Sequence, residues 1–218
     1  MSLSTLLPGL VQPITIPGYA LLLSGSGGSG KTTYGLQFLN EGLQAGEKAI
    51  FVTLDMSEKE VFEVGRGLGY DFANHASDLK VLDFFSTRPA SLNDISIPLH
   101  KIISELSGAN DMRIVIDSLS TLALLRSHDV LPPWVLQQRA RFKKASTVAV
   151  LSYDPGAHPP MLKLALQNVL DGTLELRLEE KSDGSLERYF RTFHLRGVSH
   201  STQWHGFKIV AHKGIQFL

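Results

Sequence analysis

The sequence predicts an α/β domain with a central, mainly parallel β-sheet flanked by helices and an antiparallel extension at its C-terminal end. Three observations support this prediction. Continuous apolar runs alternate with amphipathic segments over the first two thirds of the 218 residues, as expected for buried parallel strands and their connecting helices. A glycine-rich loop joins the first strand to the first helix. Beyond residue 172, segments that alternate or run apolar are separated by turn signals, which indicates antiparallel pairing.

The elements of the parallel part follow from the hydrophobic pattern and from end signals. Residues 1–17 contain three prolines and are expected to be an irregular lead-in. The elements then expected, in chain order, are a strand at 19–24, a helix at about 31–45, a strand at 49–54, a helix opening at Ser57, a strand at 79–84, a helix near 97–107, a strand at 113–116, a helix near 132–145 and a strand at 147–152.

End signals fix several of these boundaries. Gly46 ends the first helix, and Ser57 with Glu60 forms a capping box that opens the second. Pro98 is expected in the first turn of the helix near 97–107, with Gly108 just past its end. The last third is expected to add strands at 172–178, 188–195 and 207–212. With no repeat or long linker, residues 1–218 are expected to be a single domain.

Composition narrows the classes of partner. Lys and Arg (21) balance Asp and Glu (21), and the pI is about 7.1, whereas proteins that coat nucleic acid usually carry a basic excess. The basic cluster at 139–144 is expected to be a solvated helix end, and the segment 153–162 has no Lys or Arg. Nucleic acid is therefore a disfavoured partner.

Cysteine is absent, and no apolar run approaches the roughly 18 residues of a membrane span. The N-terminus also lacks the pattern of a signal peptide. These features predict a cytoplasmic protein that does not insert into membranes.

A complete phosphate-binding motif, G-x-x-x-x-G-K-[ST], follows the first strand. Its residues are Gly25, Ser26, Gly27, Gly28, Ser29, Gly30, Lys31 and Thr32. Glycine-permissive backbone angles let several N–H groups converge on one anion, and the helix N-terminus adds a partial positive charge. In such motifs the lysine reaches the β- and γ-phosphates and the hydroxyl coordinates Mg²⁺. The motif predicts ATP and Mg²⁺ as cofactors, with Lys31 and Thr32 in these roles and Thr33 at the α-phosphate.

The same loop also fits a second pattern. Gly25, Gly27 and Gly30 satisfy the dinucleotide fingerprint G-x-G-x-x-G, and Asp55 ends the next strand, where a ribose-binding acid would lie. Lys31 followed by a hydroxyl residue favours the triphosphate interpretation, because a dinucleotide site has no need of that pair. Comparing how much Mg-ATP and NAD each stabilise the protein in a thermal melt would separate the two interpretations.

Two carboxylates follow apolar strands. Asp117 ends the strand at 113–116, where an acid orients the hydration shell of Mg²⁺ in enzymes with this loop. Asp55 ends the strand at 49–54 and is a candidate for polarising the water that attacks the γ-phosphate. For each residue the competing interpretation is a helix N-cap.

Several segments together resemble the KaiC-like ATPases of the RecA superfamily, including the archaellum accessory ATPase. The resemblance begins at about residue 18 and is carried by 23–33, 51–57, 114–119, 170–172, 194–200 and 214–215. The loop alone is shared by many NTPases, but the pattern Leu-Arg-Gly-x-x-His followed by a strand and Gly-Ile is more selective. It implies a RecA-like fold with nucleotide bound between subunits of a ring or filament.

In that family, a Lys-x-Arg pair near the C-terminus reaches the γ-phosphate of the neighbouring subunit, and a histidine follows. Arg196 matches the arginine, His200 matches the histidine, and His194 replaces the lysine. From pattern alone, these residues are an ordinary polar edge strand. The resemblance implies that Arg196 acts catalytically in trans and that His200 contacts nucleotide.

Two departures predict slow hydrolysis. Asp55-Met56 stands where the family often has Glu-Glu, and His194 lacks the fixed charge of lysine. Ser152 and Asp154 end the fifth strand, where the family keeps a polar sensor, and are further candidates.

The expected function is Mg-dependent ATP binding with slow hydrolysis between subunits of a homo-oligomer, of which a hexameric ring is one form. Nucleotide state is expected to be coupled to assembly or to a protein partner. The alternatives are a non-hydrolysing, ATP-switched regulatory scaffold and a recombinase-mediator-like DNA-binding ATPase, the latter disfavoured by the neutral charge.

Overall fold

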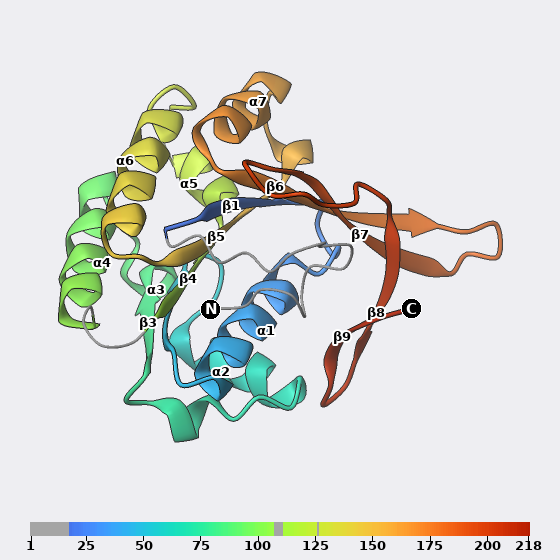
Figure 1. Cartoon of the computed structure of the whole chain (residues 1–218), viewed down its shortest axis with the longest axis horizontal. Coiled ribbons are helices and arrows are strands. Elements are labelled where there is room, and N and C mark those ends of the chain that lie inside the picture. The colour runs from blue at the N-terminus through green and yellow to red at the C-terminus, as the bar shows by residue number, and fades with distance from the viewer. Residues whose placement is uncertain (1–17, 107–110, 126) are drawn as a thin grey trace.

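The computed structural model describes residues 18–106, 111–125 and 127–218, and within them nine strands form one sheet (Figure 1). The sheet order is β3-β2-β4-β5-β1-β6-β7-β8-β9. The strands are β1 (Ala20–Ser24), β2 (Lys48–Thr53), β3 (Leu79–Asp83), β4 (Met112–Asp117), β5 (Val148–Tyr153), β6 (Gly172–Glu180), β7 (Leu186–Leu195), β8 (His205–Val210) and β9 (Gly214–Phe217).

All pairings from β3 to β6 are parallel, and those from β6 to β9 are antiparallel. The predicted fold class is therefore confirmed. The expected lead-in at 1–17 lies outside the described residues. The helices are α1 (Lys31–Gln44), α2 (Glu58–Gly67), α3 (Phe84–Thr87), α4 (Leu92–Leu106), α5 (Leu119–Leu125), α6 (Leu131–Lys144) and α7 (Pro160–Val169), with short 3₁₀ turns at Phe72–His75 and Pro155–Ala157.

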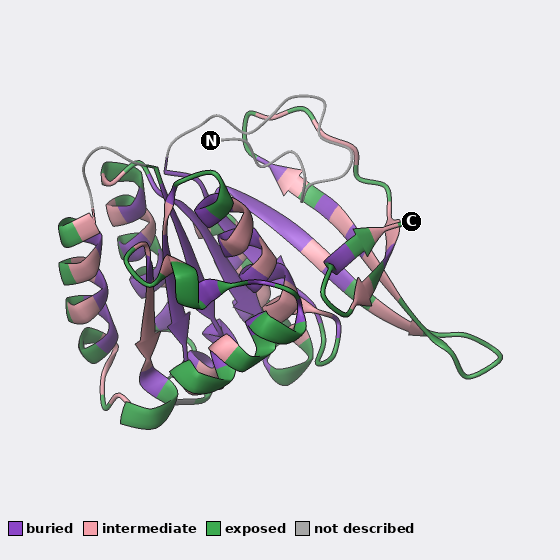
Figure 2. Cartoon of the chain, turned by 90° about the horizontal axis from the view of Figure 1, so that it is seen from below, coloured by how far each residue is buried: buried purple, intermediate pink, exposed green. Residues whose placement is uncertain are grey.

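Helices cover both faces of the parallel strands, and each face has its own apolar core (Figures 1 and 2). On one face α1 and α2 pack with Leu36, Phe38 and Val61 against alternate strand residues. On the other face α4, α5, α6 and α7 supply the apolar side chains. The alternation arises because successive side chains of a strand point to opposite faces. The β6–β7 hairpin extends beyond both layers, and its tip is exposed (Figure 2).

One predicted helix start changes in the structure, and another helix begins as expected. The capping box at Ser57 and Glu60 is present as expected. However, α4 begins at Leu92, so Pro98 lies inside the helix and not in its first turn. The earlier start coincides with a reciprocal pair of contacts, in which the N–H of Ser91 donates to Asp94 (2.7 Å) and the N–H of Asp94 donates to the Ser91 hydroxyl (3.3 Å). Gly108 lies outside the described residues.

The C-terminal part also differs from the expectation in detail. The strand expected at 207–212 ends at Val210, and His212 adopts a positive φ of 60° in the turn to β9. The segment 153–162, for which no helix was predicted, contains a 3₁₀ turn and the start of α7. Neither change affects the sheet order.

The free edge of the sheet at β9 is held by one side chain of α1. Gln37 Oε1 accepts a hydrogen bond from the N–H of Ile215 (2.6 Å), and Gln37 Nε2 donates to the carbonyl of Ile215 (3.4 Å). The Tyr70 hydroxyl donates to the same Gln37 oxygen (3.0 Å). A Cβ at Gly214 would lie 1.9 Å from that hydroxyl, which explains glycine at this position, where φ is 70°.

None of the helices within the described ranges combines the length and apolarity needed to cross a bilayer.

Candidate nucleotide-binding site

The phosphate loop lies between β1 and α1 and is built for close approach of an anion. The N–H of Gly25 donates to the carbonyl of Tyr153 (3.0 Å), which fixes the loop to the end of β5. A Cβ at Gly25 would lie 2.5 Å from Ser29 Oγ, while Gly28 and Gly30 have φ values of 73° and 103°. These positions therefore require glycine.

Two unmet polar features of the loop fit a bound phosphate. Ser29 Oγ is buried and has no hydrogen-bond partner among the described residues. Gly30 is the N-cap of α1, and no side chain caps that helix. Uncapped N–H groups in a glycine cradle are the usual means of holding a phosphate.

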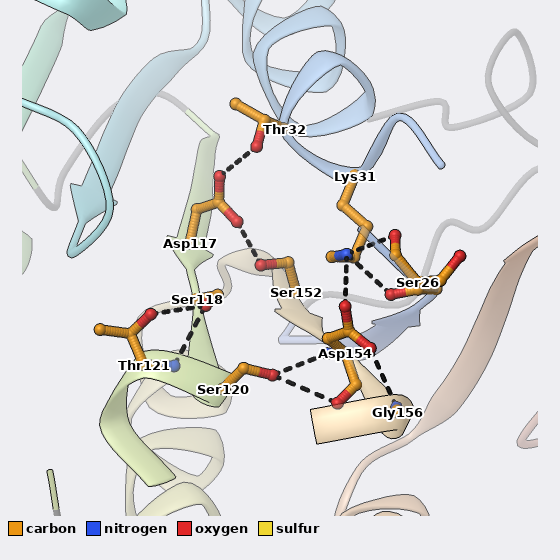
Figure 3. A network of polar contacts seen from close by, with 11 residues as sticks. Ser26, Lys31, Thr32, Asp117, Ser118, Ser120, Thr121, Ser152, Asp154 and Gly156 are labelled. Carbon is orange, nitrogen blue, oxygen red and sulfur yellow. Dashed lines mark hydrogen bonds and ion pairs between the residues drawn. The ribbon is translucent and has the colours of Figure 1, made fainter. Parts of the chain in front are cut away.

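Lys31 bends back into the loop (Figure 3). Its Nζ donates to the carbonyls of Gly25 (2.7 Å) and Ser26 (2.9 Å) and lies 3.8 Å from Asp154 Oδ2. Burial lowers the pKa of the Lys31 ammonium, while the negative charges of Asp154, Asp117 and Asp55 act in the opposite direction. The ammonium group is thus surrounded by acceptors that a phosphate would replace.

Asp117 is buried at the end of β4 and receives two hydroxyl groups (Figure 3). The Thr32 hydroxyl donates to Oδ2 (2.7 Å), and the Ser152 hydroxyl donates to Oδ1. Burial raises the pKa of the Asp117 carboxyl, hydrogen bonds from Ser152 and Thr32 lower it, and Asp55 raises it. A carboxylate beside the threonine that ends the motif is an oxygen donor set suited to Mg²⁺.

Asp55 lies at the same edge of the sheet, because β2 and β4 are parallel neighbours with Thr53 opposite Asp117. Its carboxylate is exposed and accepts a hydrogen bond from the Thr121 hydroxyl at the start of α5. It is not an N-cap, since that role belongs to Ser57. The structure therefore brings Asp55, Asp117, Lys31 and the loop together.

Asp154, a further candidate from the sequence, is fixed beside the loop. Its Oδ1 accepts from the N–H of Gly156 (2.9 Å), and its own N–H donates to the Ser120 hydroxyl (2.7 Å) (Figure 3). Thr33 lies one residue after Thr32 in the first turn of α1.

Arg196 is far from this group, and His200 lies in the segment between β7 and β8. The N–H of Arg196 donates to Asp171 (2.8 Å), and the N–H of Asp171 donates to Ala20 at the start of β1 (2.9 Å). The phosphate loop follows Ser24 at the other end of that strand, about 13 Å away at roughly 3.3 Å per residue. The structure does not bring Arg196 to the loop of its own chain.

One contact to the loop was not predicted from the sequence. Arg188 Nε, in β7, donates to the carbonyl of Gly28 (3.1 Å). The hairpin of β6 and β7 thus contacts the phosphate loop directly through this arginine. The signal that could have suggested it is an arginine in a strand that pairs with β6, the neighbour of β1. The basic cluster at 139–144, expected to be a solvated helix end, is not wholly solvated, because Arg139 forms an ion pair with the buried Asp171.

Comparison with known proteins gives a consistent result. A family model described as "ATPase: KaiC" matches residues 12–218. The UPF0273 protein of Methanopyrus kandleri is 28% identical over 94% of this chain and 88% of its own length. The circadian clock protein KaiC2 of Synechocystis is 23% identical over 92% of this chain, which spans 35% of that protein.

Among solved structures, a KaiC-like protein of Pyrococcus horikoshii superposes with a TM-score of 0.79, at 24% identity over 93% of this chain and 90% of that one. This likeness confirms the RecA-like fold. Since the family model covers almost the whole chain and its signature loop is formed, the protein belongs to the KaiC family of ATPases.

Proposed function

We propose that the protein binds ATP with Mg²⁺ and hydrolyses it slowly at contacts between copies of the chain, so that nucleotide state controls assembly or a protein partner. The observation that carries this proposal is the convergence of Lys31, Thr32 and Asp117 around a glycine cradle that contains an orphaned hydroxyl. Family membership supports nucleotide binding and an ATPase type of activity.

The residues present fit the cofactors. The loop amides and Lys31 would hold the triphosphate, and Thr32 with Asp117 would hold Mg²⁺, Asp117 through water. When bound, the ion supplies charge that offsets the negative phosphates. Asp117 already accepts hydrogen bonds from two hydroxyl groups, so its oxygens are oriented before any ligand arrives.

Asp55 is the proposed base. Its exposed carboxylate would accept a hydrogen bond from the attacking water, and the Thr121 hydroxyl holds its other oxygen. Aspartate is one methylene shorter than glutamate, and an ångström of misplacement costs about a hundredfold in rate. We therefore expect slow turnover.

Arg196 is proposed to act on the nucleotide of a neighbouring copy. Its side chain is 55% exposed, and its position at the far end of β1 keeps it from the loop of its own chain. A guanidinium that stabilises phosphoryl charge must then find that charge on another copy. This requires a homo-oligomer, with a hexameric ring as one form. The absence of cysteine and the use of ATP favour the cytoplasm as the place of action.

A second candidate is an ATP-switched scaffold with no turnover. It is favoured by the same two departures, the short Asp55 and the uncharged His194. The DNA-binding alternative is weakened further, because the segment after β5 forms a short 3₁₀ turn and α7 without basic residues before Lys163.

The test combines mass, turnover and subunit mixing. Light scattering should show a larger mass with Mg-ATP than without, and phosphate release should be slow and unaffected by single-stranded DNA. Lys31→Ala should lose ATP binding, and Arg196→Ala should keep binding but lose hydrolysis. An equal mixture of these two variants should regain activity, because an intact loop then faces an intact arginine. Arg66→Ala, which removes an exposed arginine on α2, is the matched control.

Absence of ATP binding in the parent protein would end the proposal. Binding and assembly without any phosphate release would favour the scaffold. A mixture as inactive as its components would place Arg196 outside the active site.

A further inference from the structure

The first turn of α5 contacts two of the acids that follow the parallel strands. The Thr121 hydroxyl donates to Asp55 Oδ1, and the Ser120 hydroxyl accepts a hydrogen bond from the N–H of Asp154 (2.7 Å). Ser120 therefore contacts the main chain of its acid, whereas Thr121 contacts the carboxylate itself. The side chain of Thr121 is thus placed to decide where the Asp55 carboxylate lies.

The start of α5 does not need the Thr121 hydroxyl. The main-chain N–H of Thr121 donates to Ser118 Oγ (3.2 Å), and this contact satisfies one N–H of the first turn without the Thr121 side chain (Figure 3). The two hydroxyl groups also lie 3.2 Å apart. Because Thr121 donates its proton to a carboxylate, the buried Ser118 is the donor in this second contact. The Thr121 hydroxyl is thus held from inside the fold and aimed outward at Asp55.

The main chain on both sides of Asp55 is fixed by other contacts. The Thr53 hydroxyl donates to the carbonyl of Met56 (2.7 Å) and accepts a hydrogen bond from the N–H of the same residue (3.2 Å). The N–H of Leu54 donates to the carbonyl of Asp117 (2.8 Å). The freedom that remains to the Asp55 carboxylate is therefore rotation about the bonds of a short side chain. A hydrogen bond to one of its two oxygens removes much of that freedom.

The charges around Asp55 pull its carboxylate in different directions. Asp55 acts to raise the pKa of the Asp117 carboxyl, as expected for two acids that repel each other. It also acts to raise the pKa of the Lys31 ammonium, as expected for opposite charges that attract. Entry of Mg²⁺ and phosphates would change both forces. A hydroxyl group carries no net charge, so the contact with Thr121 can persist through that change.

We infer that Thr121 is a positioning residue for hydrolysis, which holds one oxygen of Asp55 so that the other faces the attacking water. This inference rests on the proposed function, since it needs Asp55 to act as the base. In that step Asp55 receives a proton from the water as the water oxygen bonds to the γ-phosphorus and ADP leaves. Asp55 is exposed, so its second oxygen is open to water. Because misplacement of a reacting group lowers the rate steeply, a short carboxylate that is held in place is a better base than one that rotates.

The experiment compares Thr121→Val and Thr121→Ser with the parent protein. It measures ATP turnover with Mg²⁺ and the Kd of a non-hydrolysable ATP analogue. Valine keeps the shape of threonine and the main-chain contact to Ser118 but lacks the hydroxyl, which serine restores. Thr121→Val should lower kcat by about ten- to a hundredfold and should leave KM and the Kd of the analogue within about twofold of the parent values. Thr121→Ser should recover most of the lost rate.

Two further measurements separate positioning from a general effect on the fold. Thr87→Val, at the end of α3, is the matched control, because it removes an exposed threonine hydroxyl that donates to the main-chain carbonyl of Asp83 (3.0 Å). It should keep the parent rate. In an Asp55→Asn background, addition of Thr121→Val should slow the remaining turnover by less than about twofold, because no base is left to position.

The outcomes distinguish this inference from the function on which it rests. No turnover by the parent, or Asp55→Asn as fast as the parent, would overturn the proposed hydrolysis and this inference with it. If Asp55→Asn is slow, a Thr121→Val rate equal to that of the parent would overturn the inference alone. So would a Thr121→Ser rate as low as that of Thr121→Val, or a Kd that weakens by the same factor as the rate.

Discussion

The ion pair between Lys31 and Asp154 should compete with nucleotide. The two charged groups lie 3.8 Å apart, and their side chains are 13% and 25% exposed. To reach a β- or γ-phosphate, the ammonium must give up part of this interaction, and the Asp154 carboxylate also repels the incoming anion. We therefore expect Asp154→Asn to bind Mg-ATP more tightly than the parent.

The magnitude follows from the distance and the exposure. Unit charges at this separation interact by about 1 kcal/mol in bulk water and about 4 kcal/mol at the effective dielectric constant of a protein surface. Both side chains are partly exposed, so solvent screening brings the net effect toward the lower value. We expect about 1 to 2 kcal/mol, which corresponds to roughly a 5- to 30-fold lower Kd.

Isothermal titration calorimetry at low and high salt would measure this change. Asparagine keeps the oxygen that accepts from Gly156, so the local turn should survive. Asp183→Asn, in the exposed hairpin tip, removes an equal charge far from the loop and should leave the Kd unchanged. The gain of Asp154→Asn should shrink at high salt. An unchanged or weaker affinity would refute the competition and would show that Asp154 contributes to binding.

Three further predictions concern stability and use urea denaturation. Gly214→Ala should lower the free energy of unfolding by about 2 to 4 kcal/mol, because strain at positive φ adds to a steric clash. Gly184→Ala introduces the same strain but has open space around it, so it should lower the free energy of unfolding clearly less. Equal losses in the two variants would contradict the clash at position 214. Glu47→Gln should cost about 3 to 5 kcal/mol, since it leaves the buried guanidinium of Arg113 without its bidentate partner; a change below 1 kcal/mol would contradict this. Burial opposes the charge of Glu175, but hydrogen bonds from a lysine and an arginine outweigh it and hold the pKa of its carboxyl below the usual value. A carboxylate whose pKa is lower in the folded state adds stability at pH values above its unfolded pKa of about 4.3, and this stability is lost as pH falls through the folded pKa. Glu175→Gln should therefore reduce the free energy of unfolding more at pH 7 than at pH 3.5. A reduction that is independent of pH would contradict this reasoning.

Local sequence patterns predicted the parts of the site that depend on chain neighbours. The loop before Lys31 is fixed by glycines within eight residues. Asp55 and Asp117 lie at the same edge of the sheet because Asp117 ends β4 and Asp55 follows the neighbouring parallel strand β2. The same logic correctly predicted the capping box at Ser57. Hydrophobic runs were enough to find these strands, since both of their faces are buried.

The remaining features depend on contacts between distant segments. Arg188 reaches Gly28 across 160 residues, and Lys31 meets Asp154 only because β5 lies beside β1. Residues 160–169 carried a helix signal that was missed, with proline at the first position and buried leucines four residues apart at 162 and 166. The start of α4 was predicted too late, because proline favours the first turn of a helix. In the structure Pro98 lies inside α4, where the packing of the helix outweighs the cost of the proline.

The hydrogen bonds between Gln37 and β9 have a consequence for how copies of the chain can associate. Its amide uses both the N–H and the carbonyl of Ile215, the outward-facing groups that another β-strand would need. A second molecule cannot extend the sheet past β9 at this residue without first displacing that side chain. Growth by strand addition, the route to open-ended fibrils, is thereby obstructed at this edge, which leaves association to other surfaces of the molecule.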